Sequence, residues 1–129
     1  MPDPVARLTV LLVDPQADTR KLAAFMLERQ GYRVLEARNG LEAVEIFGQQ
    51  ASGVDLLLSE IAMYKMTGPK LAEKLRESQP GLRVLLMSAT PREGCYLLKK
   101  PFTNGELREK VQQALETPKT MAAGTTGLT

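Results

Sequence analysis

Four residues that carry a carboxylate, a hydroxyl or an amine stand at the ends of short apolar runs: Asp14, Glu60, Ser88 and Lys100. These groups can form ion pairs and charge-assisted hydrogen bonds when they are brought together. The runs that precede them are nearly continuously apolar, which is typical of strands buried on both faces of a parallel sheet. Because the carboxyl ends of parallel strands share one edge of a sheet, and that edge holds the site, we expect these four side chains to meet.

The elements that must position these residues alternate between strand and helix. The sequence predicts strands near residues 8–13, 32–37, 54–58, 82–87 and 95–99. Helices are predicted between them, with one crossover truncated: from Ser88 to Tyr96 there is room only for a turn or a single helical turn. Alternating strands and helices indicate right-handed βαβ units and a three-layer α/β sandwich.

Apolar residues at helical spacing predict which face of each helix is buried. The predicted buried positions are Leu22, Phe25, Met26 and the apolar stem of Arg29 in the first helix, Leu41, Val44, Ile46 and Phe47 in the second, Leu71, Ala72 and Leu75 in the third, and Leu107, Val111 and Leu115 in the last. Two helix starts carry capping signals. Thr67 is the N-cap of the third helix, and Thr103 with Glu106 forms a capping box for the last.

The composition is that of an ordinary globular protein and excludes several classes of function. The chain has 129 residues, a formal net charge of +2, no histidine and one cysteine, Cys95. Histidine-based chemistry and an internal disulfide are therefore excluded, and the weak charge gives no indication of binding to nucleic acid. No apolar stretch is long enough to span a membrane, so we expect a cytoplasmic protein that binds neither nucleic acid nor a membrane.

Residues 1–116 are expected to form one domain. From Thr117 the sequence becomes polar and rich in Gly and Thr, so residues 117–129 are expected to be a flexible tail. Cys95 is expected to be a small buried hydrophobic residue rather than a metal ligand.

Together, these segments resemble the receiver (CheY-like) domain of bacterial two-component response regulators. The resemblance covers about Leu8 to Glu116 and depends on motifs that occur in order at predicted strand ends: Val13-Asp14, residues 55–61 with Gly68, Met87-Ser88-Ala89 and Lys100-Pro101-Phe102. It implies a flavodoxin-like fold with a five-stranded parallel sheet in the order 2-1-3-4-5.

The resemblance also implies roles for individual residues. Receivers of this family take a phosphoryl group from a kinase histidine onto an aspartate at the end of the third strand, with Mg²⁺ held by two acids after the first strand. Asp14 matches the first of those acids, and Ser88 and Lys100 match the hydroxyl and the lysine that hold the phosphoryl oxygens. Pro101, which follows that lysine, is a candidate for a cis peptide bond.

Two departures from the family pattern fall at the chemical centre. Pro15 stands where the second acid belongs, and Glu60 stands where the phosphoacceptor aspartate belongs. The extra methylene of glutamate moves its oxygens by more than ~1 Å, enough to slow an attack by about 10²-fold. Magnesium held by Asp14 and Glu60 alone is expected to bind weakly at best, so we expect no cofactor.

Two functions therefore remain open. The first is a degenerate receiver that is not an enzyme and binds a signalling partner, with a histidine kinase or an effector domain as candidates, and in which Glu60 imitates the phosphorylated state or locks one state. The second is a receiver that still accepts phosphate from a histidine kinase with weak dependence on magnesium. A flavin carrier of the flavodoxin type is disfavoured because the loop after Asp14 lacks a phosphate-binding glycine run. A homodimer is left open.

Each of these residues also has a purely structural interpretation. Asp14 could cap the following helix, Glu60 could be a solvated loop acid, Ser88 could form a turn, and Lys100 could be ordinary surface charge. The spatial arrangement of the four side chains decides between the interpretations.

Overall fold

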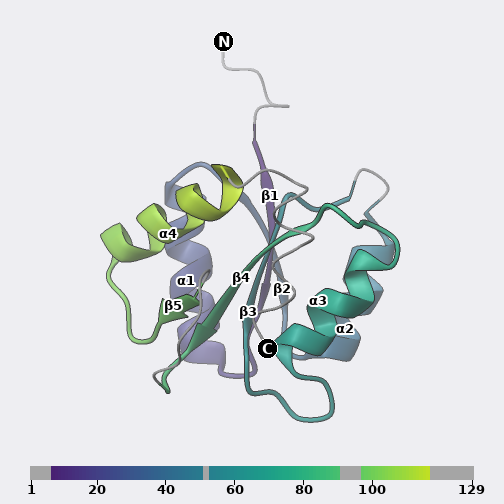
Figure 1. Ribbon diagram of the computed structural model, residues 1–129. Coiled ribbons are helices and arrows are strands. Elements are labelled where there is room, and N and C mark those ends of the chain that lie inside the picture. Colours follow the sequence, from purple (N-terminus) through teal and green to yellow (C-terminus); the bar gives the residue numbers. More distant parts are fainter. Residues whose placement is uncertain (1–6, 51–52, 91–96, 117–129) are drawn as a thin grey trace.

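A computed structural model describes residues 7–50, 53–90 and 97–116 of the chain (Figure 1). The elements, in chain order, are β1 (Thr9–Val13), α1 (Ala17–Arg29), β2 (Arg33–Ala37), α2 (Gly40–Gly48), β3 (Leu56–Glu60), α3 (Gly68–Arg76), β4 (Arg83–Ser88), β5 (Leu97–Lys99) and α4 (Asn104–Glu116). The predicted alternation of strand and helix is confirmed.

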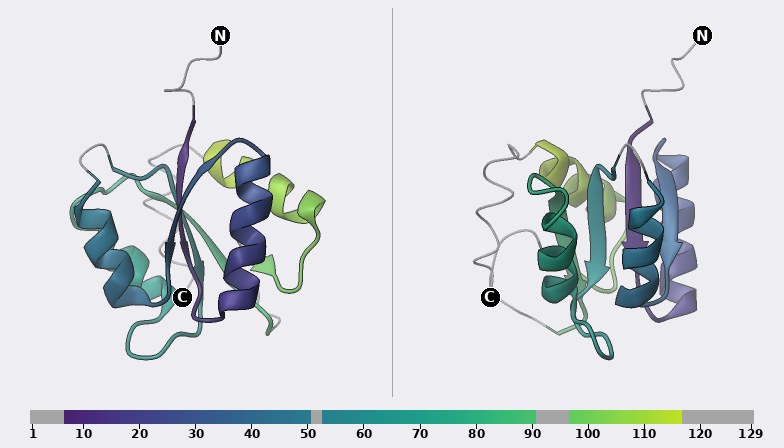
Figure 2. Two further views of the ribbon diagram at one scale, coloured as in Figure 1. Left: turned by 180° about the vertical axis from the view of Figure 1, so that it is seen from behind. Right: turned by 90° about the vertical axis from the view of Figure 1, so that its right-hand side faces the viewer.

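The five strands form one parallel sheet in the order β2-β1-β3-β4-β5. The views from the front, the back and the side place α1 and α4 over one face of the sheet and α2 and α3 over the other (Figures 1 and 2). The predicted flavodoxin-like three-layer fold is therefore confirmed. Since all strands run the same way, their carboxyl ends lie along a single edge.

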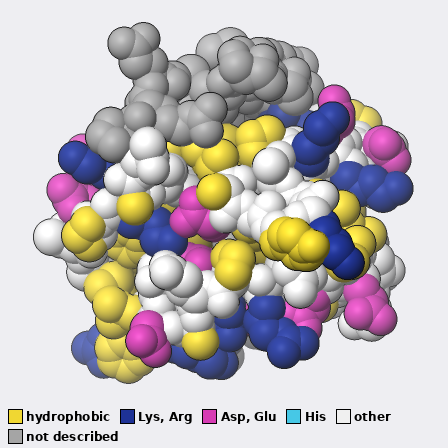
Figure 3. Space-filling model, turned by 90° about the horizontal axis from the view of Figure 1, so that it is seen from below, with side chains coloured by type: hydrophobic (Ala, Val, Ile, Leu, Met, Phe, Trp, Pro, Cys, Tyr) yellow, Lys and Arg dark blue, Asp and Glu magenta, His cyan; other side chains and the backbone are white. Residues whose placement is uncertain are grey.

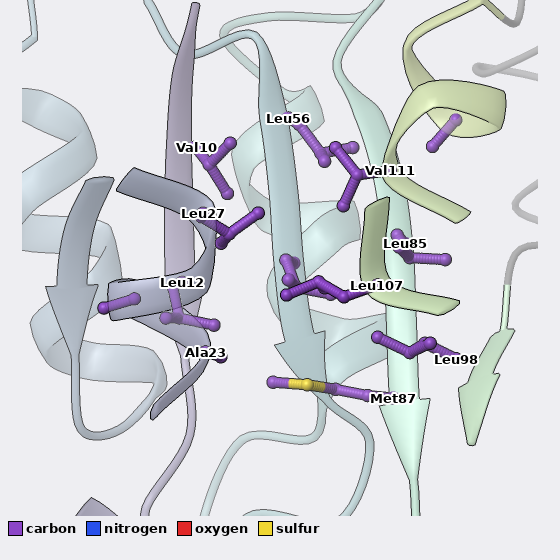
Figure 4. Close-up of a cluster of buried hydrophobic side chains, with 13 residues drawn as sticks. Val10, Leu12, Ala23, Leu27, Leu56, Leu85, Met87, Leu98, Leu107 and Val111 are labelled. Carbon is purple, nitrogen blue, oxygen red and sulfur yellow. The ribbon is translucent and has the colours of Figure 1, made fainter. Parts of the chain in front are cut away.

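The core is divided into two layers by the alternation of side chains along each strand. Val10 and Leu12 of β1 point into the layer beneath α1 and α4, while Leu11 and Val13 point into the layer beneath α2 and α3. Figure 4 shows the first layer, in which strand side chains meet Leu27 of α1 and buried residues of α4. Burial on both faces explains why the strand sequences are almost purely apolar.

The buried face predicted for α1 is wrong at Leu22, Phe25 and Arg29, which are exposed, whereas Met26 is partly buried and packs against the core. Leu22 and Phe25 are 54% and 57% exposed, whereas the buried positions of the helix are Arg20, Ala23, Ala24 and Leu27. Both sets have helical spacing, and the prediction favoured the set with larger side chains. The small alanines let the helix approach the sheet closely, which turns the neighbouring apolar stripe towards solvent.

The other helices follow the predicted patterns more closely. Leu41 in α2 is exposed, contrary to expectation, because Gly40 and Ala43 take the inward positions beside Phe47. The buried residues predicted for α3 are confirmed, as are Leu107 and Val111 in α4.

Both predicted helix caps are confirmed. The Thr67 hydroxyl accepts the backbone N–H of Lys70. Thr103 and Glu106 exchange two hydrogen bonds of 2.8 and 3.1 Å, as a capping box requires.

The connection between β4 and β5 is short. The structure describes only residues 89 and 90 of this connection, and neither is helical. The expectations for Cys95, for the start of the fifth strand at residues 95–96 and for the tail at residues 117–129 lie outside the described residues.

One glycine is required by the close approach of two backbone segments near the edge that carries Glu60. A Cβ on Gly68 would stand 2.5 Å from the Glu60 carbonyl oxygen and 3.2 Å from the Ile61 Cα. The Gly68 N–H also donates to the Ile61 carbonyl at 2.9 Å, which closes the loop between β3 and α3. The first residue of α3 is thus packed directly against the end of β3.

Gly68→Ala is expected to destabilise the fold by about 2 kcal/mol, because backbone at the end of β3 must move to admit the methyl group. The free energy of unfolding from urea titration measures this loss. Gly48→Ala is the control, because a Cβ on exposed Gly48 meets nothing within 4 Å. That control should stabilise α2 by about 0.5 kcal/mol. Equal effects of the two substitutions would contradict the packing argument.

Candidate functional site

Asp14 is the first residue after β1 and is completely buried. Its backbone N–H donates to the Ala37 carbonyl, and its own carbonyl accepts a hydrogen bond from Arg20 Nη1 at 2.8 Å. One carboxylate oxygen, Oδ1, accepts the Gln16 N–H at 2.9 Å, and the other, Oδ2, accepts Lys100 Nζ at 2.9 Å. Every polar group of Asp14 therefore has a partner, and its carboxylate faces the carboxyl edge of the sheet.

Lys100 lies directly after β5, 8% exposed, with its ammonium between two carboxylates. Nζ is 2.9 Å from Asp14 Oδ2 and 2.7 Å from Glu60 Oε1. Burial alone lowers the pKa of Lys100 and is the largest single influence. The hydrogen bonds and charges of Glu60 and Asp14 together outweigh it, so the pKa of Lys100 is raised above its ordinary value of 10.5. The lysine is thus held in its charged form.

Glu60 ends β3, and its side chain is only 12% exposed. While Oε1 accepts from Lys100, Oε2 accepts the backbone N–H of Ala62 at 3.1 Å. Both oxygens of this carboxylate are therefore bonded to groups of the chain itself. We name Asp14, Glu60 and Lys100 the acid–lysine cluster; it joins the ends of β1, β3 and β5.

Ser88 ends β4 and lies beside the acid–lysine cluster; among the hydrogen bonds found in the described residues, its hydroxyl makes none to the three side chains of the cluster. The Ser88 hydroxyl accepts the Thr90 N–H at 3.0 Å, and its carbonyl accepts the Lys100 N–H at 2.9 Å. The Lys100–Pro101 peptide bond is cis, the isomer for which Pro101 was a candidate. The backbone at the end of β4 therefore holds Lys100, whose ammonium bonds to Asp14 and Glu60.

A cavity of about 620 Å³ opens over these residues at the carboxyl edge of the sheet. Its polar lining includes the acid–lysine cluster and Ser88 together with Gln16, Asp18, Thr19 and Thr90, and its apolar lining includes Pro15, Leu22, Ala89, Pro101 and Phe102. Figure 3 looks onto this edge and shows acidic side chains near the middle of the face, beside basic and hydrophobic ones. The cavity is therefore lined by both charged and apolar side chains.

The donor set at this edge does not fit a magnesium ion. Within the described ranges, no group of three or more acidic or cysteine side chains could hold a metal. Asp14 and Glu60 both bond to Lys100, and Pro15 offers no carboxylate. Mg²⁺ in proteins is usually held by one or two carboxylates, with waters completing a near-ideal octahedron, and here an ion would have to displace the Lys100 ammonium from both acids.

Three contributors to the site were not predicted from the sequence. The N–H groups of Gln16 and Ala62 hold the two carboxylates, and buried Arg20 holds the Asp14 carbonyl. Backbone donors carry no sequence signal. Arg20 occupies an inward position of α1, and a correct choice of the buried helix face would have drawn attention to it.

The parallel sheet, with an acid–lysine cluster and a hydroxyl at its carboxyl edge, defines a receiver-type signalling module. The family model for the response regulator receiver domain matches residues 10–112. Because this match covers most of the sequence, the chain belongs to the response regulator receiver family. Such domains are typically non-catalytic modules of two-component signalling.

Individual proteins show the same relationship. The chain is 32% identical over 118 residues to "Sensor kinase CckA" of Brucella abortus (strain 2308), an alignment that covers 84% of this chain and 12% of that kinase. A crystal structure of the receiver domain of hybrid histidine kinase CckA has a TM-score of 0.74 and 34% identity, covering 84% of this chain and 99% of the other. Response regulator TrrA of Thermotoga maritima, solved with Mg²⁺ and BeF, has a TM-score of 0.73 and 27% identity, with coverage of 83% and 98%.

None of the helices in the described parts of the chain is long and apolar enough to cross a membrane.

Lys100→Met is expected to destabilise the protein by about 3 kcal/mol at neutral pH, because two buried carboxylates lose their shared counter-charge. Lys99→Met, which removes the exposed neighbouring lysine, is the control and should change stability by less than about 0.5 kcal/mol. Urea titration of both variants measures the two free energies of unfolding.

The difference in the free energy of unfolding between the wild type and Lys100→Met should depend on pH with a definite sign. Since the folded pKa of Lys100 is raised, its stabilising contribution is fully present below the unfolded value of 10.5 and is lost as the pH rises through the folded value. From neutral pH upwards, the stability gap between the wild type and Lys100→Met should therefore begin to shrink only in that alkaline range. A gap that shrinks between neutral pH and 10 would contradict the assignment.

Proposed function

We propose that this chain is a degenerate receiver: a protein-binding module of a two-component pathway that is not phosphorylated in the usual way. One observation carries the proposal. The Lys100 ammonium is held 2.7 Å from Glu60 and 2.9 Å from Asp14, so the groups that would receive a phosphoryl group and its cation are already bonded to one another.

The length of the Glu60 side chain supports this function. Its carboxylate spans from the Ala62 N–H to Lys100 Nζ, which fixes both of its oxygens. A phosphoryl acceptor must approach in line with the leaving group, and displacement of a nucleophile by about 1 Å is enough to slow a reaction by about 10²-fold. Glu60 instead places a permanent negative charge against Lys100, in the way that a bound phosphoryl group would.

The missing second acid supports the same function. A divalent cation normally neutralises the phosphoryl oxygens during transfer to a carboxylate. At Pro15 the chain has a pyrrolidine ring in place of a carboxylate, and Asp14 is engaged by Lys100. The charge of the two carboxylates is therefore offset in part by an internal ammonium rather than by an exchangeable ion.

The output of such a module is the binding of another signalling protein, with a histidine kinase or an effector domain as the candidates. The Brucella relative is itself a sensor kinase, of which this chain matches a small part. A domain whose acid–lysine cluster is formed without phosphorylation would present one surface to its partner at all times. Binding would then depend on the concentrations of the two proteins and not on a phosphorylation signal.

A second candidate function is a receiver that still accepts phosphate with weak dependence on magnesium. The position of Ser88 and Lys100 in the lining of one cavity favours it, because this pair could hold phosphoryl oxygens. The two candidates differ in whether Glu60 is ever modified.

Intact-mass measurement separates the two candidates. After brief incubation with an acyl phosphate and Mg²⁺, the wild type should gain no phosphoryl group, because Glu60 is misplaced and the metal ligands are incomplete. The double variant Pro15→Asp/Glu60→Asp restores both groups and should gain one.

Pro15→Asp/Glu60→Asn is the matched control, since it has the restored acid but no carboxylate at the acceptor position. It should remain unlabelled, which would assign the label in the first variant to residue 60. Stoichiometric labelling of the wild type, lost in Glu60→Gln, would favour the second candidate and overturn the proposal.

A further inference from the structure

Arg20 is a buried arginine one turn into α1 and is 7% exposed. Burial of a guanidinium group is unfavourable unless its N–H groups find acceptors. Here Nη1 donates to the Asp14 carbonyl at 2.8 Å, and Nε donates to Glu36 Oε1 at 3.1 Å. The planar guanidinium therefore bridges the ends of two neighbouring strands, β1 and β2.

The Asp14 carbonyl lies outside the regular hydrogen bonding of both sheet and helix. Pro15 follows it and has no N–H, and the first bond of α1 runs from the Arg20 N–H to the Gln16 carbonyl. Among the hydrogen bonds of the described residues, Arg20 Nη1 is the donor to the Asp14 carbonyl. Without the arginine, this buried acceptor would have to turn towards other partners.

Rotation of that carbonyl would also redirect the Asp14 side chain. Asp14 Oδ1 accepts the N–H of Gln16, so the carbonyl, Pro15 and this N–H belong to one tight turn. If the peptide between Asp14 and Pro15 rotates, the Gln16 N–H moves away from Oδ1. The carboxylate then loses the contact that aims Oδ2 at Lys100.

Groups of alternating charge link the surface of the protein to the acid–lysine cluster through Arg20. Lys21 Nζ lies 3.3 Å from Glu36 Oε1, and Glu36 in turn bonds to Arg20. Arg20 contacts the backbone of Asp14, whose carboxylate bonds to Lys100. The Arg20–Glu36 pair therefore supports Asp14 through its backbone carbonyl, whereas Lys100 bonds to its carboxylate.

We infer that Arg20 is a positioning residue: it fixes the turn after β1 so that the Asp14 carboxylate shares Lys100 with Glu60. The inference rests on the proposed function in so far as the acid–lysine cluster is the working part of the module. The arginine itself touches neither Lys100 nor Glu60 among the hydrogen bonds and ion pairs found in the described residues.

Hydrogen exchange at two backbone amides tests the inference. The Gln16 N–H reports directly on the Asp14 carboxylate, and the Lys70 N–H, accepted by the Thr67 hydroxyl, reports on a similar cap elsewhere. In Arg20→Gln, exchange at Gln16 should become about tenfold faster, corresponding to the loss of one hydrogen bond, while Lys70 stays unchanged.

Arg76→Gln is the matched control variant. Like Arg20, Arg76 donates to a backbone carbonyl, but both of its hydrogen bonds, at 3.0 and 2.9 Å, go to the carbonyl of Leu82, just before β4. The Arg76→Gln variant should have a lower free energy of unfolding. Once corrected for that loss of stability, its exchange rate at the Gln16 N–H should equal that of the wild type. Arg20→Lys keeps the charge without the planar pair of donors and should restore the Gln16 rate only in part.

A merely structural role for Arg20 would accelerate Gln16 and Lys70 equally, and that result would overturn the inference. An unchanged Gln16 rate in a folded Arg20→Gln variant would overturn it as well. The exchange rates do not depend on whether Glu60 accepts phosphate. A failure of the proposed function, seen as labelling of the wild type, is therefore distinguishable from a failure of this inference.

Discussion

The structure at the carboxyl edge depends on a single buried ammonium shared by two carboxylates. Moving three charged groups out of water carries a large desolvation penalty, which mutual attraction repays only when the geometry is good and the remaining polar atoms are bonded. Both conditions are met here. Lys100 lies within 3 Å of each acid, and the second oxygen of each acid accepts a backbone N–H. The cluster carries one net negative charge, which those two N–H groups and the helical start beside Asp14 offset in part.

The rest of the fold serves to bring these groups together. Asp14, Glu60 and Lys100 are separated by tens of residues in the sequence, and the parallel order of the sheet places the ends of their strands side by side. Apolar layers on both faces fix the strands, and the absence of a side chain at Gly68 lets α3 begin directly against Glu60. The cluster is thus built on rigid elements rather than on free loops, as precise placement of charges requires.

Much of this arrangement could be predicted from the sequence, because it follows from strong and repeated signals. Continuous apolar runs identify buried parallel strands, and the shared edge then follows for the residues at their ends. Which face of α1 is buried could not be predicted in the same way. Two adjacent stripes had helical spacing, and the larger residues, Leu22 and Phe25, lie on the exposed one.

The contacts within the site were also beyond the sequence. An arginine in a helix has the same sequence signal whether it is solvated or buried, so the role of Arg20 appears only once its acceptors are located. The sharing of Lys100 by both acids depends on side-chain reach and on the backbone donors Gln16 and Ala62, neither of which is encoded in residue type alone. The departures at Pro15 and Glu60, by contrast, are visible in the sequence and acquire their physical meaning from this geometry.

The central claim is that the acid–lysine cluster is closed to a phosphoryl group. A crystal structure grown with Mg²⁺ and beryllofluoride, the type of ligand present in the Thermotoga maritima regulator, tests it most directly. We expect Lys100 to remain bonded to both Asp14 and Glu60, with no beryllium attached to the glutamate. A beryllium–oxygen bond at Glu60, with Lys100 turned to the fluorides and a metal ion beside Asp14, would contradict it.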